Sequence, residues 1–476
     1  MKLKKTLAIF GALPFLFSAC TQSASSSSSA DERDIMADLF PEMENINNEY
    51  EAELYFNYEM LDLFYIYAHM RNELADNYKV YLNKGTSQDS RTKGYCSANY
   101  YDVCYMYNQM ADPFTRYFDN IVAEQIYSSI MESESIVGIG AEVEEKLDST
   151  SRYLLITDIY PGSPAEKAGL KVGDIVVQVD GLNITSALNF ENMCTGNKDD
   201  VINIVVSRNS EPISVNVTVD EYNEPSVKLT YQDSIPVIQI KEFVVTSISD
   251  SGSYGEFVSA LKKTEGATST IIDLRGNPGG ETEQCANMAA ELLSAGDTVV
   301  IDIEATVDSI VNGRNIKYYQ AFDTLTVTAE HDGIGKNRYY VFMADTGSAS
   351  CAETMLSALT ANRKVPVVGQ LTYGKGIGQL VIQTEIGEGL ALVTALQGFD
   401  KNWESYHDLG IVPDFEIDDP DAQMAKAVEL AKEAQFVRAA GYGTEKLNHF
   451  SKEHEHEASG RIPTAKDLKL RYKIAK

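Results

Sequence analysis

From about residue 225 onwards, short apolar runs alternate with amphipathic stretches, and this alternation restricts the possible fold more than any other feature of the chain. The pattern predicts buried strands at 237–240, 269–274, 339–343 and 365–368, and helices at 253–263 and 351–361. Strands and helices in this order build a sheet that is covered by helices. We therefore predict an α/β core over 223–420, followed by a C-terminal helix and tail at 421–476.

The chain before this core contains two regions with different sequence patterns. Residues 40–132 show helical periodicity that is rich in aromatic side chains, which predicts a helical N-terminal domain. Residues 133–222 contain short β-type runs separated by turns, with a short helix at 163–168. With 476 residues the chain is too long for a single core, so a division into several domains is expected.

The first residues have the pattern of a signal peptide, predicted at 1–19. Three lysines precede an apolar run at 7–17, and Ser18 and Ala19 stand directly before Cys20. Small residues followed by cysteine resemble a bacterial lipobox, although Phe17 stands where leucine is usual. This resemblance implies that Cys20 becomes the lipidated first residue, and the serine-rich linker at 20–39 would then act as a flexible tether. The alternative is an ordinary cleaved signal peptide; both predict an exported protein, periplasmic or at the cell surface.

Charge and cysteine content exclude several classes of function. With 40 basic and 70 acidic residues, the net charge of −30 disfavours binding to nucleic acid or, by charge alone, to anionic membranes. We therefore expect membrane contact through the lipid anchor only. Beyond Cys20 there are five cysteines without metal-ligand spacing, so we predict no metal, no cofactor and no disulfide framework. Cys96 and Cys104 are expected either to pair or to remain as thiols.

Residues 133–222 resemble a PDZ domain. The resemblance rests on Gly138-Ile139-Gly140, on P-G-S-P-A-E-K-A-G-L at 161–170 and on V-G-D-I-V-V-Q-V-D-G at 172–181. The two glycines allow a loop whose backbone N–H groups face a terminal carboxylate. The resemblance implies that Gly138, Ile139 and Gly140 bind the C-terminus of a peptide.

Three segments of the α/β core carry candidate chemistry. They are D-L-R-G-N-P-G-G at 273–280, G-S-A-S-C-A-E at 347–353 and T-Y-G-K-G-I-G-Q at 372–379. The glycine pair exposes backbone N–H groups that suit an oxyanion, although a plain tight turn would also explain it. Ser350 precedes a predicted helix, so its alternative role is a helix N-cap. Lys375 lies between glycines, which is unusual for a solvated lysine, and in an extended chain Gln379 lies on the same face.

In this order the segments resemble the C-terminal processing (tail-specific) serine proteases, over roughly residues 100–435. The resemblance implies an α/β spiral core of the crotonase/ClpP type with an inserted PDZ domain. It also implies Ser350 as nucleophile, Lys375 as general base and Gln379 as the amide that orients Lys375. The oxyanion hole would be formed by the amides of Gly279, Gly280 and Cys351. The segments at 112–117 and 410–414 also match the family, whereas Cys351 and Ala352 stand where Ala and Ser are common.

The resulting hypothesis is a serine endopeptidase that cleaves proteins at or near their C-termini. The partners would be protein or peptide substrates bound by the C-terminus, and a Ser-Lys dyad requires a lysine pKa far below the usual ~10.4. One alternative is a PDZ scaffold with a degenerate protease domain, which the intact Ser350, Lys375 and Gln379 disfavour. Another is a crotonase-type acyl-transfer enzyme, for which no thioester site is evident. His407 is the one histidine in the C-terminal part of the core, and we expect it to be structural.

Overall fold

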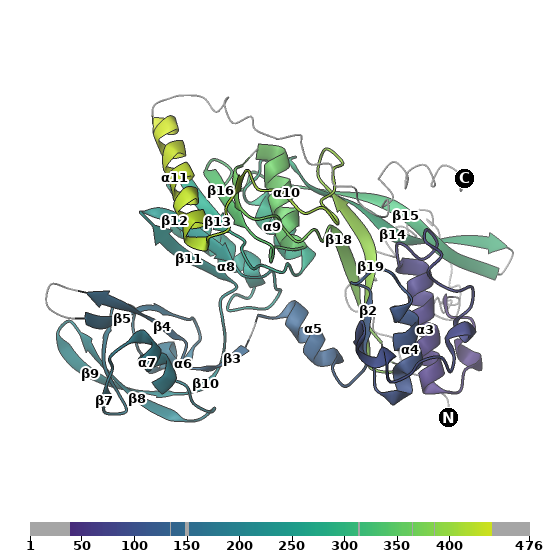
Figure 1. Ribbon diagram of the computed structural model, residues 1–476, viewed down its shortest axis with the longest axis horizontal. Helices are drawn as coiled ribbons and strands as arrows, with labels where there is room; N and C mark the ends of the chain where they lie inside the picture. Colours follow the sequence, from purple (N-terminus) through teal and green to yellow (C-terminus); the bar gives the residue numbers. More distant parts are fainter. Residues whose placement is uncertain are drawn as a thin grey trace, which may run out of the picture.

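The computed structural model describes residues 39–439, apart from 134, 148–151, 313–314, 364 and 385. Three parts can be followed in Figure 1: a small β-rich domain at the lower left, an α/β core above it, and helices α3 and α4 packed on long strands at the right. The predictions for Cys20, for the segment 1–38 and for the tail beyond residue 439 fall outside the described residues.

The α/β core is a mainly parallel sheet with helices on both faces, in the strand order β11-β12-β13-β16-β17-β20. Only β11 is antiparallel to its neighbour. The strands are β11 (Val227–Gln232), β12 (Ile235–Ile240), β13 (Ser269–Asp273), β16 (Tyr339–Ala344), β17 (Val367–Gly369) and β20 (Phe415–Glu416). The helices are α8 (Gly252–Lys263), α9 (Thr282–Ala290), α10 (Cys351–Arg363) and α11 (Pro420–Ala439).

Alternate strand residues of this sheet belong to two separate apolar cores. Ile272 and Phe342 pack with residues of α8, α9 and α10, whereas the neighbouring Ile271 and Val341 pack with residues of α11. Successive side chains of a strand point to opposite faces, so both faces need a helical cover. The predicted α/β class is confirmed.

A second sheet has the order β1-β2-β19-β14-β15, with β18 paired to β19. Its strands are β1 (Gly94–Tyr95), β2 (Arg116–Phe118), β14 (Thr298–Asn312), β15 (Asn315–Thr328), β18 (Ile377–Gln383) and β19 (Leu390–Phe399). Helices α3 (Glu49–Phe64) and α4 (Tyr101–Asn108) share an aromatic-rich core with this sheet. The segment predicted as helical therefore also contributes strands β1 and β2, and the long β14–β15 hairpin was not predicted.

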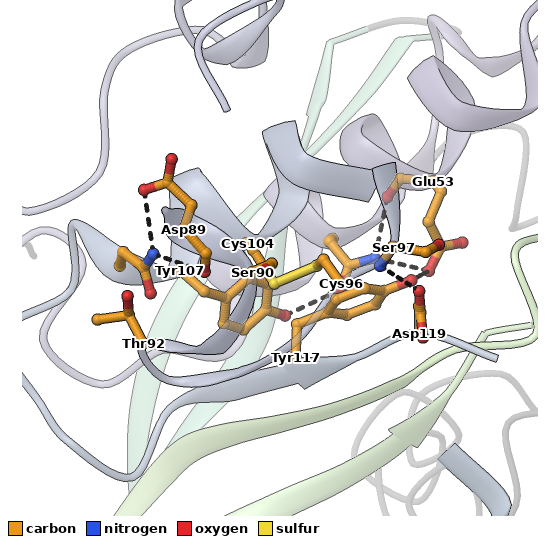
Figure 2. The surroundings of a disulfide bond; sticks show 12 residues. Glu53, Asp89, Ser90, Thr92, Cys96, Ser97, Cys104, Tyr107, Tyr117 and Asp119 are labelled. Atoms are coloured by element: carbon orange, nitrogen blue, oxygen red, sulfur yellow. Dashed lines mark hydrogen bonds between the residues drawn. A yellow bond between two sulfur atoms is a disulfide. The ribbon is translucent and has the colours of Figure 1, made fainter. Parts of the chain in front are cut away.

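A buried carboxylate joins α3 to this sheet. Glu53 accepts hydrogen bonds from Tyr117 Oη at 2.8 Å, Thr384 Oγ1 at 2.7 Å, Gly387 N at 3.0 Å and Asn57 Nδ2 at 3.0 Å. Figure 2 shows Glu53 and Tyr117 together beside β2. Burial raises the pKa of Glu53, and the hydrogen bonds oppose that shift. The N-terminal segment is thus fixed to the strands that follow the predicted catalytic segments.

The β-rich domain has its own sheet and apolar core, as the PDZ resemblance implies. The strand order is β4-β5-β6-β8-β9, with β7 paired to β6. The elements are β4 (Ala141–Leu147), β5 (Arg152–Ile159), β6 (Ile175–Val179), β7 (Leu182–Asn183), β8 (Val201–Arg208), β9 (Glu211–Thr218), α6 (Pro164–Ala168) and α7 (Ala187–Met193). Strands β3 (Ser135–Gly138) and β10 (Asp220–Asn223) pair with each other where the chain enters and leaves this domain.

Two disulfides link cysteines of the described chain, and they correct the prediction that no disulfide framework exists. Cys96 pairs with Cys104 in the N-terminal segment, and Cys285 pairs with Cys351 between α9 and α10. Figure 2 shows the first pair. The second pair joins residues that are 66 positions apart, so their proximity is a product of the tertiary fold. Cys194 is a buried free thiol.

Among the described residues, no helix combines the length and the apolar character that crossing a membrane requires. Within the same residues, His, Cys, Asp and Glu side chains do not gather in groups of three or more that would hold a metal ion.

Candidate active site

The glycine turn and the serine turn lie side by side, because each follows a strand of the same parallel sheet. Strand β13 leads into the turn at 274–281, and the adjacent β16 leads into the turn at 345–350. Ala349 N donates a hydrogen bond to Asn277 O at 2.9 Å. A Cβ atom built on Gly279 would lie only 2.7 Å from the Cβ of Ser350, so only glycine permits this approach. The ends of neighbouring parallel strands are where α/β folds place their sites.

Ser350 has a backbone conformation that is unusual for a residue with a side chain. Its φ is +54°, in the left-handed region, immediately before α10. Such a conformation costs on the order of 1–3 kcal/mol and is concentrated at functional sites. The Oγ atom makes no hydrogen bond among the described residues, whereas Ser350 N donates to the Glu353 carboxylate. At the start of α10, Ser350 thus contributes its backbone N–H and not its hydroxyl. In the N-cap alternative, the hydroxyl would accept a hydrogen bond from a backbone N–H of the first turn.

Glu353 connects the serine turn to the lysine segment. Its carboxylate accepts four hydrogen bonds of 2.5–3.0 Å, from Thr372 Oγ1, Gly374 N, Lys375 N and Ser350 N. Each oxygen accepts two of them, so an ionised carboxylate uses its four acceptor positions completely. The side chain is fully buried, and burial raises the pKa of Glu353 against the effect of these hydrogen bonds.

Lys375 lies in a partly buried position between two tightly packed glycines. A Cβ on Gly374 would lie 2.9 Å from Gly410 N, and a Cβ on Gly376 would lie 2.9 Å from His407 N. The Lys375 ammonium lies over the Phe114 ring at 4.9 Å from its centroid. Burial lowers the pKa of Lys375 to about 8, while the carboxylates of Asp112 and Glu353 act in the opposite direction. The buried charge therefore costs roughly 3 kcal/mol relative to water.

Gln379 fixes the end of the lysine side chain. Lys375 Nζ donates to Gln379 Oε1 at 2.7 Å, and Gln379 Nε2 donates to Phe114 O at 2.6 Å. The second bond sets the orientation of the amide, because only its NH2 group can donate to the Phe114 carbonyl oxygen. The amide oxygen therefore faces Lys375 Nζ as an acceptor. No hydrogen bond joins Lys375 Nζ to Ser350 Oγ among the described residues. The backbones of the two segments are joined through Glu353 and through the hydrogen bond from Tyr373 N to Ser348 O at 3.0 Å.

Of the three predicted oxyanion donors, Gly279 already has an acceptor. Its N–H donates to Asn277 Oδ1 at 2.8 Å. Within the described part of the chain, the N–H groups of Gly280 and Cys351 donate to no acceptor. Cys351 is the first residue of α10, where backbone N–H groups lack partners inside the helix. Gly280 and Cys351 are thus the two amides that remain available to a ligand.

The glycine loop predicted to bind a carboxylate lies in the β-rich domain, between β3 and β4. Gly140 has a positive φ, and a Cβ there would lie 2.3 Å from the Ser163 Cβ. Ile139 is buried, and its carbonyl accepts a hydrogen bond from Ala165 N. Strand β4 pairs with β5 on one side only, and Ala187 N at the start of α7 donates to Glu145 Oε1 of β4 at 3.1 Å. One edge of β4 is therefore free of strand partners among the described residues.

His407 packs behind the lysine segment and makes no hydrogen bond to Ser350 or Lys375. The ring is buried, its Nδ1 has no hydrogen-bond partner among the described residues, and burial lowers the pKa of His407. A structural role stays our prediction for it.

Sequence reasoning missed Glu353, Phe114 and the Cys285–Cys351 pair as parts of this site. The spacing S-x-x-E from Ser350 to Glu353 is that of a capping box, which was a usable local signal for Glu353. The family match of the segment 112–117 pointed to the neighbourhood of Phe114, but it gave no role to this residue, because its contact with Gln379 spans 265 positions of sequence.

Comparison with known proteins supports the assignment of both domains. Residues 234–417 match the family model of peptidase family S41, and residues 155–208 match that of the PDZ domain. A probable CtpA-like serine protease of Staphylococcus haemolyticus (strain JCSC1435) is 26% identical over 356 residues, covering 72% of this chain and 66% of its own length. One of Staphylococcus aureus (strain bovine RF122 / ET3-1) is 27% identical over 333 residues, covering 69% and 61%. The chain thus spans slightly less than two thirds of the length of these relatives.

Among solved structures, the photosystem II D1 C-terminal processing protease aligns with a TM-score of 0.45 at 20% identity, over 78% of this chain and 94% of that protein. The S41 match contains Ser350, Lys375, Gln379 and the glycine turn, and the PDZ match runs from within β5 to the end of β8. The chain therefore contains a peptidase family S41 domain at 234–417 and a PDZ domain at 155–208.

Proposed function

We propose that this protein is a serine endopeptidase that uses a Ser350–Lys375 dyad, with Gln379 as the residue that orients the lysine. The observation that carries the proposal is the environment of Lys375. Its side chain is desolvated, lies over an aromatic ring and is hydrogen bonded to an amide whose own orientation is fixed. No ion pair of Lys375 occurs among the described residues, so no directly contacting carboxylate holds the ammonium in its charged form.

In the proposed reaction, neutral Lys375 removes the proton of Ser350 Oγ while that oxygen attacks a peptide carbonyl carbon. A neutral amine has two N–H bonds and one lone pair, and Gln379 Oε1 accepts one of the N–H bonds. The negative charge on the former carbonyl oxygen is stabilised by the N–H groups of Gly280 and Cys351. The lysine then returns the proton to the leaving amine, and water hydrolyses the resulting acyl-enzyme with the same base.

We further propose that the PDZ domain binds the C-terminus of the substrate, which is then cleaved at or near that end. The free edge of β4 is suited to accept an extended peptide as an added strand. The loop at Gly138–Gly140 precedes β4, so its N–H groups would receive the terminal carboxylate.

Export and lipid anchoring at Cys20 are also proposals. Two disulfides among the described residues support a location in an oxidising compartment, because such bonds are rare in reducing cytosol. The serine-rich linker at 20–39 would separate the folded domains from the membrane surface.

The dyad is tested with Ser350→Ala and Lys375→Arg. Each variant is expected to lower the rate of β-casein cleavage at least about a thousandfold, since serine is the nucleophile and guanidinium cannot act as a neutral base. Product ends are mapped by mass spectrometry, and cleavage should cluster near the C-terminus. His407→Ala is expected to retain activity. An active Lys375→Arg enzyme would contradict the dyad, and a wild type that binds C-terminal peptides without cleaving them would indicate a scaffold.

The pH dependence of kcat/KM tests the base separately. Lys375 acts only when neutral, so kcat/KM is expected to rise with pH through a midpoint of about 8. Gln379→Glu places a carboxylate against the ammonium, which raises the pKa of Lys375. The rising limb of the kcat/KM profile should therefore move to higher pH. Gln383→Glu adds the same charge at an exposed position of the same strand and should leave the limb unchanged. An unmoved limb in Gln379→Glu would exclude Lys375 as the titrating group.

Glu353→Gln tests the connection between the two catalytic segments. An amide in place of one oxygen would present N–H groups to two of the four donors, so we expect unfolding to require about 2–4 kcal/mol less and kcat to fall. Glu283→Gln, an exposed residue in the first turn of α9, should change the free energy of unfolding by less than about 0.5 kcal/mol. Equal stabilities and rates in both variants would refute the role of Glu353.

Lipid anchoring is tested with Cys20→Ser in the full-length chain. The wild type is expected to partition into the detergent phase of a Triton X-114 separation, and the variant into the aqueous phase, because the acyl chains are lost. A mature N-terminus at a residue other than Cys20 would contradict the anchor and leave simple secretion.

A further inference from the structure

The Cys285–Cys351 disulfide joins the two helices that begin at the proposed oxyanion hole. Cys351 directly follows Ser350 and is the first residue of α10. Cys285 lies in the first half of α9, which begins two residues after Gly280. Both cysteines are 1% exposed and belong to the apolar core beneath the site. The disulfide therefore lies directly behind the two amides that remain available to a ligand.

The contacts around this bond leave little freedom for the two turns. Glu281 caps α9 by accepting hydrogen bonds from Glu283 N and Gln284 N, so the glycine turn moves with that helix. Phe243 N donates to Gly279 O at 3.0 Å, and Glu281 N donates to Phe243 O at 2.8 Å. On the other side, the start of α10 is held through Ser350 N and Glu353.

We propose that the Cys285–Cys351 disulfide positions the active site by fixing α9, and with it the glycine turn, against the start of α10. This inference rests on the proposed peptidase function. The disulfide would then keep the separation of the Gly280 and Cys351 amides constant while an oxyanion forms between them. The two cysteines are positioning residues, because they act through the backbone amides and touch no substrate atom with their side chains.

Because negative charge develops on the oxyanion, kcat is sensitive to the positions of the Gly280 and Cys351 amides. Loss of one preorganised donor from such a site typically costs about 100- to 1000-fold in kcat. If a donor is displaced but still present, we expect a smaller decrease in kcat, of about 10- to 100-fold. Binding of the substrate chain elsewhere is unaffected by this displacement, so KM should stay nearly constant.

The second disulfide of the chain supplies a matched control. Cys96–Cys104 is also buried, but it lies in the N-terminal segment near Glu53 and Tyr117 (Figure 2). Removing either pair should lower the Tm, since each cross-link restricts the unfolded chain. Only removal of Cys285–Cys351 should lower kcat. A merely structural role would make the two pairs equivalent in this respect.

The experiment compares the wild type, Cys285→Ala/Cys351→Ala and Cys96→Ala/Cys104→Ala, with fluorescein-labelled β-casein as the substrate. Alanine preserves the amide of residue 351 and leaves no thiol at either of the two substituted positions. We expect kcat to fall about 10- to 100-fold in the first variant, with KM within twofold, and to stay unchanged in the second. Equal kcat in the wild type and the first variant, or equal losses in both variants, would overturn the proposal.

Reduction provides a second measurement in case the first variant does not fold. In folded Cys96→Ala/Cys104→Ala protein, dithiothreitol opens only the Cys285–Cys351 bond, and non-reducing peptide mapping shows when it is open. The rate should fall on reduction and recover on reoxidation; an unchanged rate, or absence of the linked peptide before reduction, would overturn the proposal. A wild type that does not cleave β-casein would instead contradict the proposed function on which this inference rests.

Discussion

The carboxylate of Glu353 is the contact on which the rest of the candidate site depends. It receives donors from both the serine turn and the lysine segment, two loops at the ends of different strands that are also joined by the hydrogen bond from Tyr373 N to Ser348 O. A buried charge is costly unless its acceptor positions are filled, and here all four are. The hydrogen bonds that fill these acceptor positions therefore also fix the backbone of Ser350 relative to that of Lys375.

The site is completed by a segment that is remote in sequence. The Phe114 carbonyl orients Gln379, and the Phe114 ring covers the Lys375 ammonium. Asp112 holds this segment by accepting hydrogen bonds from Phe114 N, Thr115 and Thr394 Oγ1. Since β2 pairs with β19, the N-terminal part of the chain is built into the sheet that carries the lysine. The desolvation of Lys375 therefore depends both on the segment around Phe114 and on the lysine segment itself.

The PDZ domain is joined to the core by more than its two connecting strands. Lys228 of β11 forms an ion pair with Glu142 of β4, and Glu142 also accepts a hydrogen bond from Tyr160. These contacts lower the pKa of Glu142 against the effect of burial. The edge proposed to receive a substrate C-terminus is therefore connected to the sheet that supports the turns of the candidate site.

The sequence by itself determined the α/β class, the PDZ domain and the residue types at 350, 375 and 379, because strand periodicity, glycine turns and short motifs are local properties. The spacing of four residues also predicted that Lys375 and Gln379 lie on the same face of an extended chain, and the family resemblance implied their pairing. The tertiary structure alone decided which glycine amide is already occupied, that Phe114 covers the lysine, and that Cys285 meets Cys351 across 66 positions. Contacts between distant segments depend on how whole sheets and helices pack, and a local pattern carries no information on that packing.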